Sequence, residues 1–396
     1  MTLRGKTGHE IKVAYLAPAA MLQHAAASCA RFGHCFGEVL QEKPPSVRRP
    51  ERIVLYSDEV SPGNQPKHTN RRKLQVVYWS LQELGSLRLT NESSWFVLTA
   101  VRTETVNSIN GGMAQVAREC IKSLHREAAD FSAGILISVP GPKHFVMVCK
   151  TKVRAVRFAF FCQNVIQRRY APESMEGLAF HDELDSRKFK LHTDGSVFSF
   201  ARHLQARAAE LNKEELSKVE ANTGFNHAPE GVLLDPLLQT KVLPISATCF
   251  DPMHVFPVAG VFHLELTLLV DSLAKKSKVK QSDIHIFYSD CVWPAHLRAR
   301  GTTGQALFAK KYEDGFKSSA SEALAVYPVL RLFLQMLKPA QAAGVNKQLV
   351  SFFALCSVLD ALRLAGAGTL AASMLLEKIM AHLRAFQAPR MNLQTL

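Results

Sequence analysis

The sequence predicts a mixed α/β fold that continues into a helical C-terminal region. Short apolar runs of strand character surround one amphipathic helix between residues 53 and 149. Apolar residues then recur at steps of three and four through most of residues 321–387, which is the spacing of packed core helices. With 47% hydrophobic and 21% charged residues among 396, the composition is globular and excludes a disordered or fibrous protein.

The first segment, residues 1–40, is expected to form a strand and a helix. Residues 11–16 have strand character, and an alanine-rich helix is expected from Pro18 to about Arg31, because proline suits the first turn of a helix. Residues 41–50 combine prolines with a basic cluster and are expected to be a linker.

Residues 51–150 are expected to form the first part of a β-rich core. Strands are predicted at residues 53–57, 74–81 and 95–102, a helix from Gly111 to about His125, and further strands at 134–139 and 145–149. The order strand, strand, strand, helix, strand is the opening of the RNase H-like fold, a mixed sheet with flanking helices.

The rest of the chain divides into a basic segment and a helical region. Residues 151–245 are polar and broken, and we expect an irregular insertion with a charged helix at 201–221. Residues 246–396 are expected to be the helical C-terminal region, with helices near 258–273, 321–337, 347–364 and 369–387.

The net charge of +14 and the pI near 9.5 suggest an anionic partner, with nucleic acid ahead of a membrane. A basic soluble protein without such a partner is the alternative. Clusters of arginine and lysine beside aromatic residues are candidate DNA contacts, and a half-buried strand with a solvated face is the alternative for the second cluster. The candidates are Arg71, Arg72, Lys73, Arg154, Arg157, Arg168 and Arg169.

The eight cysteines are scattered, and no two of them form a CxxC pair. This pattern argues against a disulfide framework and a zinc module and is typical of a reducing compartment. Cys149 and Cys162, with His144 nearby, are better read as two buried thiols than as a zinc site. No run reaches the roughly 18–20 apolar residues of a membrane span. We therefore expect a nuclear or cytoplasmic protein that is neither secreted nor embedded in a membrane.

Asp58 is the first candidate for chemistry, since it follows the strand-like run at residues 53–57 and precedes a Pro-Gly-Asn turn. A carboxylate at the end of a buried strand is well placed to hold a divalent metal against a phosphate. Adjacent strand residues point to opposite faces, so Asp58 and Glu59 are not expected to face one site together. A turn that merely begins with acidic residues is the alternative.

Asp251, His254 and Glu265 form a second candidate set. Asp251 and His254 are three residues apart and share one face of a helical turn, where they would bind a metal or hydrogen-bond to each other. Glu265 lies three helical turns beyond His254 on a similar face. The alternative for Asp251 is a helix cap followed by Pro252 at the first helical position.

Several motifs together resemble KDZ-type transposases, a family with an RNase H-like DDE catalytic core, and the resemblance covers most of the chain. The most specific motifs are residues 56–64 (YSDEVSPGN) and 251–255 (DPMHV). The other matching segments are residues 70–74 (NRRKL), 78–80 (YWS), 111–116 (GGMAQV), 161–164 (FCQN), 224–226 (GFN), 230–231 (EG), 260–262 (GVF), 318–328 (SSASEALAVYP) and 352–362.

The resemblance implies a site in which three carboxylates hold two Mg²⁺ or Mn²⁺ ions, which activate a water or a DNA 3′-hydroxyl. Asp58 matches the first of these acids. Asp251 and His254 resemble an element that is structural more than catalytic in such transposases.

The chain departs from the family pattern at the other two acids. The segment that carries the second acid is missing between Lys150 and Phe158, and Ala159, Phe160 and Phe161 stand where a cysteine partner of Cys162 is expected. The third carboxylate would fall in a region beyond Leu396. We therefore expect a degenerate and truncated transposase-like protein that binds DNA and is catalytically inactive.

Two other functions stay open from the sequence. In an active nuclease or transposase, Asp235, Asp251 or Glu265 would lie within about 4–6 Å of Asp58 and complete the metal site. In a non-enzymatic interaction protein, the helices of residues 320–390 would expose a large apolar patch. The target DNA and the oligomeric state are not specified by these patterns.

Overall fold

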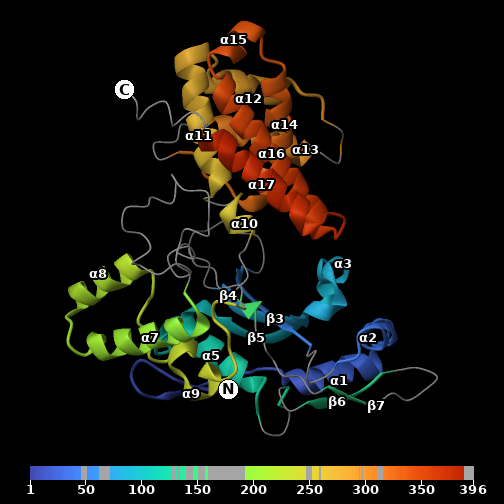
Figure 1. The fold of residues 1–396 in the computed structure, drawn as a ribbon, viewed down its shortest axis with the longest axis vertical. Coiled ribbons are helices and arrows are strands. Elements are labelled where there is room, and N and C mark those ends of the chain that lie inside the picture. Colours follow the sequence, from blue (N-terminus) through green and yellow to red (C-terminus); the bar gives the residue numbers. More distant parts are fainter. Residues whose placement is uncertain are drawn as a thin grey trace. The chain divides into compact units, whose positions relative to one another are not determined.

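The computed structural model describes residues 1–45, 51–61, 72–126, 130–131, 134–139, 146–149, 157–158, 192–246, 252–257, 260–293, 295, 298–309 and 315–387. These residues form two compact units, one up to residue 246 and one from residue 252 onwards (Figure 1). The structure is thus a mixed α/β fold with a helical C-terminal region, as predicted.

The first unit begins with a small hairpin and two helices. Strand β1 (Thr2–Arg4) pairs antiparallel with β2 (Glu10–Lys12), and helices α1 (Pro18–Ser28) and α2 (Ala30–Glu42) follow. Pro18 occupies the first turn of α1, as the sequence predicts. The second helix, α2, extends through residues that the sequence assigns to the end of the first segment and the start of the linker.

The central sheet has the strand order β5-β4-β3-β8. Strands β3 (Ile53–Val60), β4 (Leu74–Leu81) and β5 (Phe96–Arg102) are antiparallel, and β8 (Arg157–Phe158) joins β3 in parallel. Short helices connect the strands: η1 (Gln82–Leu84), α3 (Ser86–Leu89) and η2 (Glu92–Ser94) before β5, and α4 (Thr103–Ser108) and α5 (Met113–Ser123) after it. The three predicted strands are confirmed, and β3 is three residues longer than expected.

One face of this sheet carries the core of the first unit. Leu55 lies opposite Trp79, and Ile53 lies opposite Leu81, and all four side chains are buried. Helix α5 adds Val116 to the same core, together with the neighbouring Cys120 and Ile121. Figure 1 shows α1, α5 and α9 on the same side of the central sheet.

The next two predicted strands exist, but they do not join the central sheet. Strand β6 (Ile135–Ser138) pairs antiparallel with β7 (Val146–Cys149) in a separate two-stranded sheet. The strand on the side of β3 opposite β4 is β8, in the segment that the sequence assigns to an irregular insertion. Sequence pattern identifies a strand, whereas its pairing depends on contacts distant in the chain.

Residues 192–246 contain helices α7 (Asp194–Ala208) and α8 (Lys213–Thr223), then η6 (Val232–Leu234) and α9 (Pro236–Gln239). The sequence predicts a single helix at 201–221, and the chain instead begins a new helix at Asn212. The side chain of Asn212 accepts hydrogen bonds from the backbone of Glu214 and Glu215, and Glu215 binds the Asn212 backbone in return.

The second unit is entirely helical in its described residues. Its elements are α10 (Pro252–Val255), α11 (Val261–Ser272), the π-helical turn η7 (Leu273–Ser277), α12 (Gln281–Asp290), α13 (Arg298–Ala309), α14 (Ala320–Gln335), α15 (Pro339–Ala343), α16 (Asn346–Gly366) and α17 (Ala372–Gln387). Phe262, Tyr288, Tyr327 and Phe352 are fully buried at its centre. The helices predicted near 258–273, 321–337, 347–364 and 369–387 are confirmed as α11, α14, α16 and α17.

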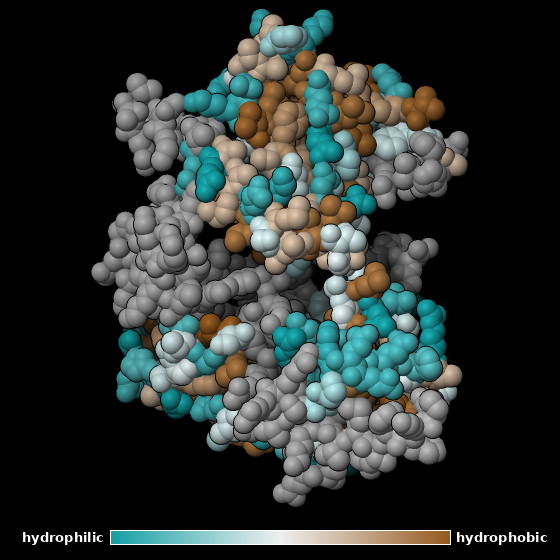
Figure 2. Space-filling model, turned by 45° about the vertical axis from the view of Figure 1, so that its right-hand side comes forward, coloured by the Kyte–Doolittle hydropathy of each residue, from teal (hydrophilic) through white to brown (hydrophobic). Residues whose placement is uncertain are grey.

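Helix α16 is long and apolar enough to cross a membrane by length and composition, and 44% of its most apolar window is buried inside the protein. Its Leu355, Cys356 and Leu359 belong to the core of the helical unit. Hydrophobic side chains also reach the surface of this unit (Figure 2).

Candidate functional site

Asp58 lies near the end of β3, opposite Val76 on β4, and its side chain is exposed. The hydroxyl of Tyr56 donates a hydrogen bond to Asp58 Oδ2 at 3.0 Å, and the backbone N–H of Glu59 donates to Oδ1 at 2.8 Å. Because β3 continues to Val60, Asp58 and Glu59 point to opposite faces of the sheet, as expected. Asp58 is therefore the acid on the face that does not carry the core.

An aromatic group supports the Asp58 face. The rings of Tyr56 and Tyr78 stack with centroids 6.1 Å apart, and the ring of Trp95 meets Tyr56 edge-on at 6.4 Å. Trp95 is itself fixed by a 2.9 Å hydrogen bond from Nε1 to the carbonyl of Leu89. These contacts orient Tyr56 so that its hydroxyl stays on the Asp58 carboxylate.

Glu59 has a structural role on the opposite face. Its carboxylate accepts hydrogen bonds from Lys73 Nζ at 2.6 Å, Gln75 Nε2 at 3.1 Å and Thr103 Oγ1 at 3.2 Å. The hydrogen bond from Lys73 is the main reason why the pKa of Glu59 lies below its ordinary value. Glu59 thus links β3 to β4 and to the residue that follows β5. Lys73, a predicted DNA contact, is bound to Glu59 in this link.

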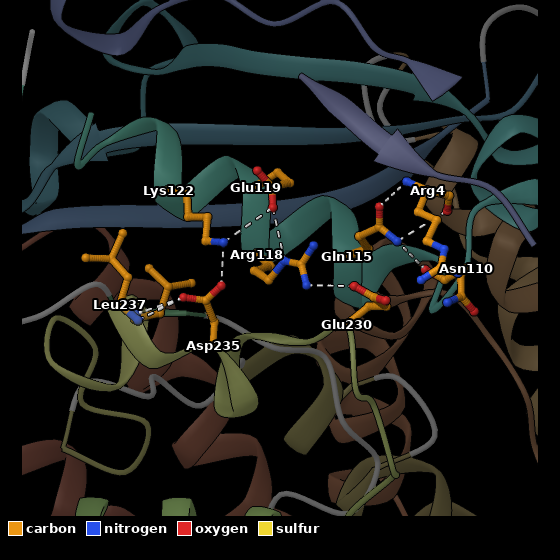
Figure 3. Close-up of polar contacts among 10 residues, drawn as sticks. Arg4, Asn110, Gln115, Arg118, Glu119, Lys122, Glu230, Asp235 and Leu237 are labelled. Atoms are coloured by element: carbon orange, nitrogen blue, oxygen red, sulfur yellow. Dashed lines mark hydrogen bonds and ion pairs between the residues drawn. The ribbon is translucent and has the colours of Figure 1, made fainter. Parts of the chain in front are cut away.

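Asp235 caps a helix and binds a lysine (Figure 3). Its Oδ1 accepts hydrogen bonds from the backbone of Leu237 at 3.1 Å and Leu238 at 3.2 Å, at the start of α9. Its Oδ2 lies 2.5 Å from Lys122 Nζ on α5. The residue is 8% exposed, so its carboxylate is used to dock α9 on α5.

Asp235 is one end of a longer row of polar contacts along α5 (Figure 3). Arg118 Nη1 lies 2.7 Å from Glu230 Oε2, and Arg118 Nε lies 3.0 Å from Glu119 Oε1. The buried Gln115 accepts from the backbone N–H of Arg4 at 2.5 Å and donates to the Asn110 carbonyl at 2.8 Å.

The members of the row at positions 115, 118, 119 and 122 share one side of α5 because they follow helical spacing. They join α5 to β1 and to the 230–238 segment. Each charged side chain that α5 contributes to the row has a partner of opposite charge. The row therefore has a structural role, which is to hold α5 against its neighbours.

Glu265 lies on α11 in the second unit and is 4% exposed. Its Oε1 accepts hydrogen bonds from Ser351 Oγ on α16 at 2.9 Å and from His382 Nε2 on α17 at 2.6 Å. Its Oε2 is buried and has no hydrogen-bond partner among the described residues. Glu265 therefore joins three helices of the second unit, whereas Asp58 belongs to the first.

The other predicted site residues are described in part or not at all. Arg72 is exposed just before β4. His254 lies in α10 and Arg157 in β8, and for both the structure describes the backbone only. Asp251, Arg71, Arg154, Arg168 and Arg169, as well as His144 and Cys162 of the loose zinc set, lie outside the described residues. Within the described ranges, no group of three histidine, cysteine or acidic side chains is placed to hold a metal ion.

No protein-family model, curated protein or solved structure gives a significant match to the chain.

Sequence reasoning missed two features of the second unit. The partners of Glu265 are 86 and 117 residues away along the chain, so no local sequence pattern predicts these contacts. The exposed lysines at 275, 276, 278 and 280 do have a local signal, because four lysines stand within six residues.

Proposed function

We propose that this chain is a degenerate relative of the DDE transposases that binds DNA and does not cleave it. The central sheet supports an RNase H-like core: three antiparallel strands follow in chain order, helices α4 and α5 come next, and β8, which follows the separate β6–β7 pair, lies parallel to the first strand. Asp58 stands on that first strand, where the resemblance to KDZ-type transposases puts the first catalytic acid.

The observation that carries the proposal is that the acids near and beyond Asp58 already have structural partners. Glu59 binds Lys73, Asp235 caps α9 and binds Lys122, and Glu265 is buried between Ser351 and His382. Two-metal catalysis needs carboxylates that converge on two ions about 3.5–4 Å apart. Moving any of these three acids to such a site would break a helix cap, an interstrand tie or a buried contact.

The proposed DNA affinity rests on charge. The net charge of +14 favours a polyanionic partner, and neutralised phosphates release counterions, so binding weakens as salt increases. We expect binding with little sequence preference from such contacts, because phosphates carry no sequence information.

The test is an assay of DNA cleavage and DNA binding on the full chain. Wild-type protein and Asp58→Ala are incubated with supercoiled and branched DNA in Mg²⁺ or Mn²⁺, and a binding titration is run at several salt concentrations. We expect no cleavage by either protein and salt-sensitive binding by both. Cleavage that disappears in Asp58→Ala would overturn the proposal in favour of an active nuclease that uses Asp58 with Asp251 or another acid.

A second candidate, a helical interaction protein, is favoured by apolar side chains that the second unit exposes (Figure 2). They include Leu332 at 50%, Met336 at 65%, Val350 at 52%, Leu364 at 51% and Leu376 at 59% exposure. This function predicts neither cleavage nor salt-sensitive DNA binding in the same assay, so one experiment separates the two.

A further inference from the structure

Four lysines are presented together on the turn between α11 and α12. Lys275, Lys276, Lys278 and Lys280 are all exposed, and we call residues 273–280 the lysine turn. Within the described ranges, none of these four lysines is in an ion pair.

The lysine turn is held in place by the residues between the lysines. Leu273 and Val279 are buried in the core of the second unit, at 0% and 3% exposure. The hydroxyl of Ser277 donates a 2.6 Å hydrogen bond to the carbonyl of Gln341, and the N–H of Val279 donates to the Leu273 carbonyl at 3.2 Å. Because Leu273, Ser277 and Val279 point into the unit, the four lysines beside them are directed to solvent.

The backbone of the turn is unusual in two ways. Residues 273–277 form a π-helical turn, a feature often found at functional sites. Lys278 has φ of 56°, a left-handed conformation that costs about 1 kcal/mol or more for a residue with a side chain. The surrounding contacts hold a lysine where glycine would be less strained.

Two more lysines lie at the same end of the helical unit. Helix α15 packs on the lysine turn, so closely that a Cβ at Gly344 would lie 3.2 Å from the carbonyl oxygen of Lys276. Lys338 immediately precedes α15, and Lys347 is the second residue of α16; both are exposed. Figure 1 shows α15 at one end of the second unit.

The charge of this end is strongly unbalanced. Against six lysines, the adjacent ends of α11 and α12 supply Asp271 and Asp283, and Asp283 already accepts a 2.8 Å hydrogen bond from the backbone of Lys280. Like charges this close repel one another and destabilise the folded unit. A polyanion that bridged them would remove that repulsion.

We propose that the lysine turn, with Lys338 and Lys347, is a contact surface for the phosphate backbone of DNA. The inference rests on the proposed DNA binding and assigns it to lysines of the helical unit, which are not among the basic clusters that the sequence suggests. Lysine contacts phosphates as a point charge. A membrane-surface segment would pair its lysines with apolar side chains that insert into the bilayer, whereas within the lysine turn Leu273 and Val279 are turned into the core.

The test compares two variants of the full chain that lose the same charge. The first is K275Q/K276Q/K278Q/K280Q; the control is K6Q/K12Q/K213Q/K218Q, which changes four exposed lysines of the first unit. Binding to a fluorescent 30-base-pair duplex is titrated over a series of NaCl concentrations. We expect the lysine-turn variant to lose at least tenfold in affinity and about 3 to 4 in the slope of log K against log salt. The control should stay within threefold of wild type.

Three further arms keep the result interpretable. The four Lys→Arg substitutions in the turn should retain binding, and thermal unfolding should show that each variant folds. Equal DNA binding by wild type and the lysine-turn glutamine variant would show that the lysine turn is not the DNA contact and would leave the proposed function unchanged. No DNA binding by wild type would overturn both the contact surface and the proposed function. Binding to phosphatidylserine vesicles but not to DNA, lost in the lysine-turn variant, would replace DNA with a membrane as the partner.

Discussion

At the scale of single residues, the candidate acids differ in their burial and in the groups that bind their carboxylates. Asp58 is exposed and touches only Tyr56 and its own strand among the contacts described above, whereas Asp235 is nearly buried and binds a helix start and a lysine. The sequence predicts Asp58 as the metal-facing acid and includes Asp235 only in the alternative of an active nuclease. Their contacts predict different consequences of mutation.

Asp235→Asn should keep the cap of α9 and lose the attraction to Lys122. Asparagine is as good a cap as aspartate, so we expect a loss of at most about 1 kcal/mol in the free energy of unfolding. Asp235→Ala should lose the cap as well, with a total loss of about 1–2 kcal/mol. Urea denaturation of both variants measures this order, and equal losses would show that the cap contributes nothing.

At the scale of elements, α12 and α13 are held together by a position that admits only glycine. A Cβ at Gly304 would lie 2.0 Å from Cε1 of Tyr288, a fully buried ring whose hydroxyl donates to the Val326 carbonyl at 2.7 Å. The ring is buried and its hydroxyl is bound, so moving it aside would break that hydrogen bond and its packing.

Gly304→Ala should therefore destabilise the second unit by about 1–3 kcal/mol or more, as overpacked cores do. Gly366→Ala is the matched control, because a Cβ there meets no atom within 4 Å and alanine favours a helix over glycine. We expect the control to be neutral or more stable by up to about 1 kcal/mol. Thermal unfolding of the two variants side by side tests the pair, and a tolerated Gly304→Ala would mean that α12 and α13 separate easily.

The helices and strands also show which parts of the fold can be predicted from the sequence. The periodicity of Leu330, Leu334, Leu355 and Leu359 suffices to place α14 and α16, since burial of one face follows from helical spacing. The start of α8 at Asn212 also has a local signal, because asparagine followed by Glu215 is a capping box, although the prediction of one helix over 201–221 does not use it. The pairing of β6 with β7 was not, because it depends on which partner strand is nearest in space.

At the scale of the whole molecule, each unit contains a buried histidine that resists protonation. Burial lowers the pKa of His125 in the first unit and of His263 in the second below the ordinary value of 6.5. His125 Nδ1 lies 3.1 Å from Asp130 Oδ1, and His263 Nε2 lies 2.7 Å from Ser318 Oγ. For His125, burial lowers the pKa by more than the Asp130 carboxylate raises it. The contact is therefore a hydrogen bond from a neutral imidazole ring.

Stability should therefore decrease as pH falls below about 6.5. In that range the unfolded chain binds protons that the folded chain excludes, and each such histidine contributes at most about 1.4 kcal/mol per pH unit until its lower folded pKa is reached. Above pH 7.5 both states are neutral at these rings and the contribution is constant. Denaturant titrations between pH 5 and 8 measure the slope, which should be smaller in His125→Gln/His263→Gln; an unchanged slope would assign it to other groups.

Only part of the arrangement around the candidate site can be predicted from the sequence. That Asp58 and Glu59 point to opposite faces of the sheet is predictable, because alternation along a strand is a local property. The partners that occupy Asp235 and Glu265 come from α5, α16 and α17, and only the folded chain brings them together.

Helix α17 has one buried side chain, and that side chain is His382. A helix held mainly by half-exposed contacts and one polar anchor should detach from the unit by a local opening well below the free energy of global unfolding. Hydrogen exchange should thus be faster for amides of α17 than for those of α16, and His382→Ala should accelerate it further by leaving Glu265 with Ser351 alone. Proteases would then gain access to the chain near residue 370, and cleavage there would release α17 from the helical unit.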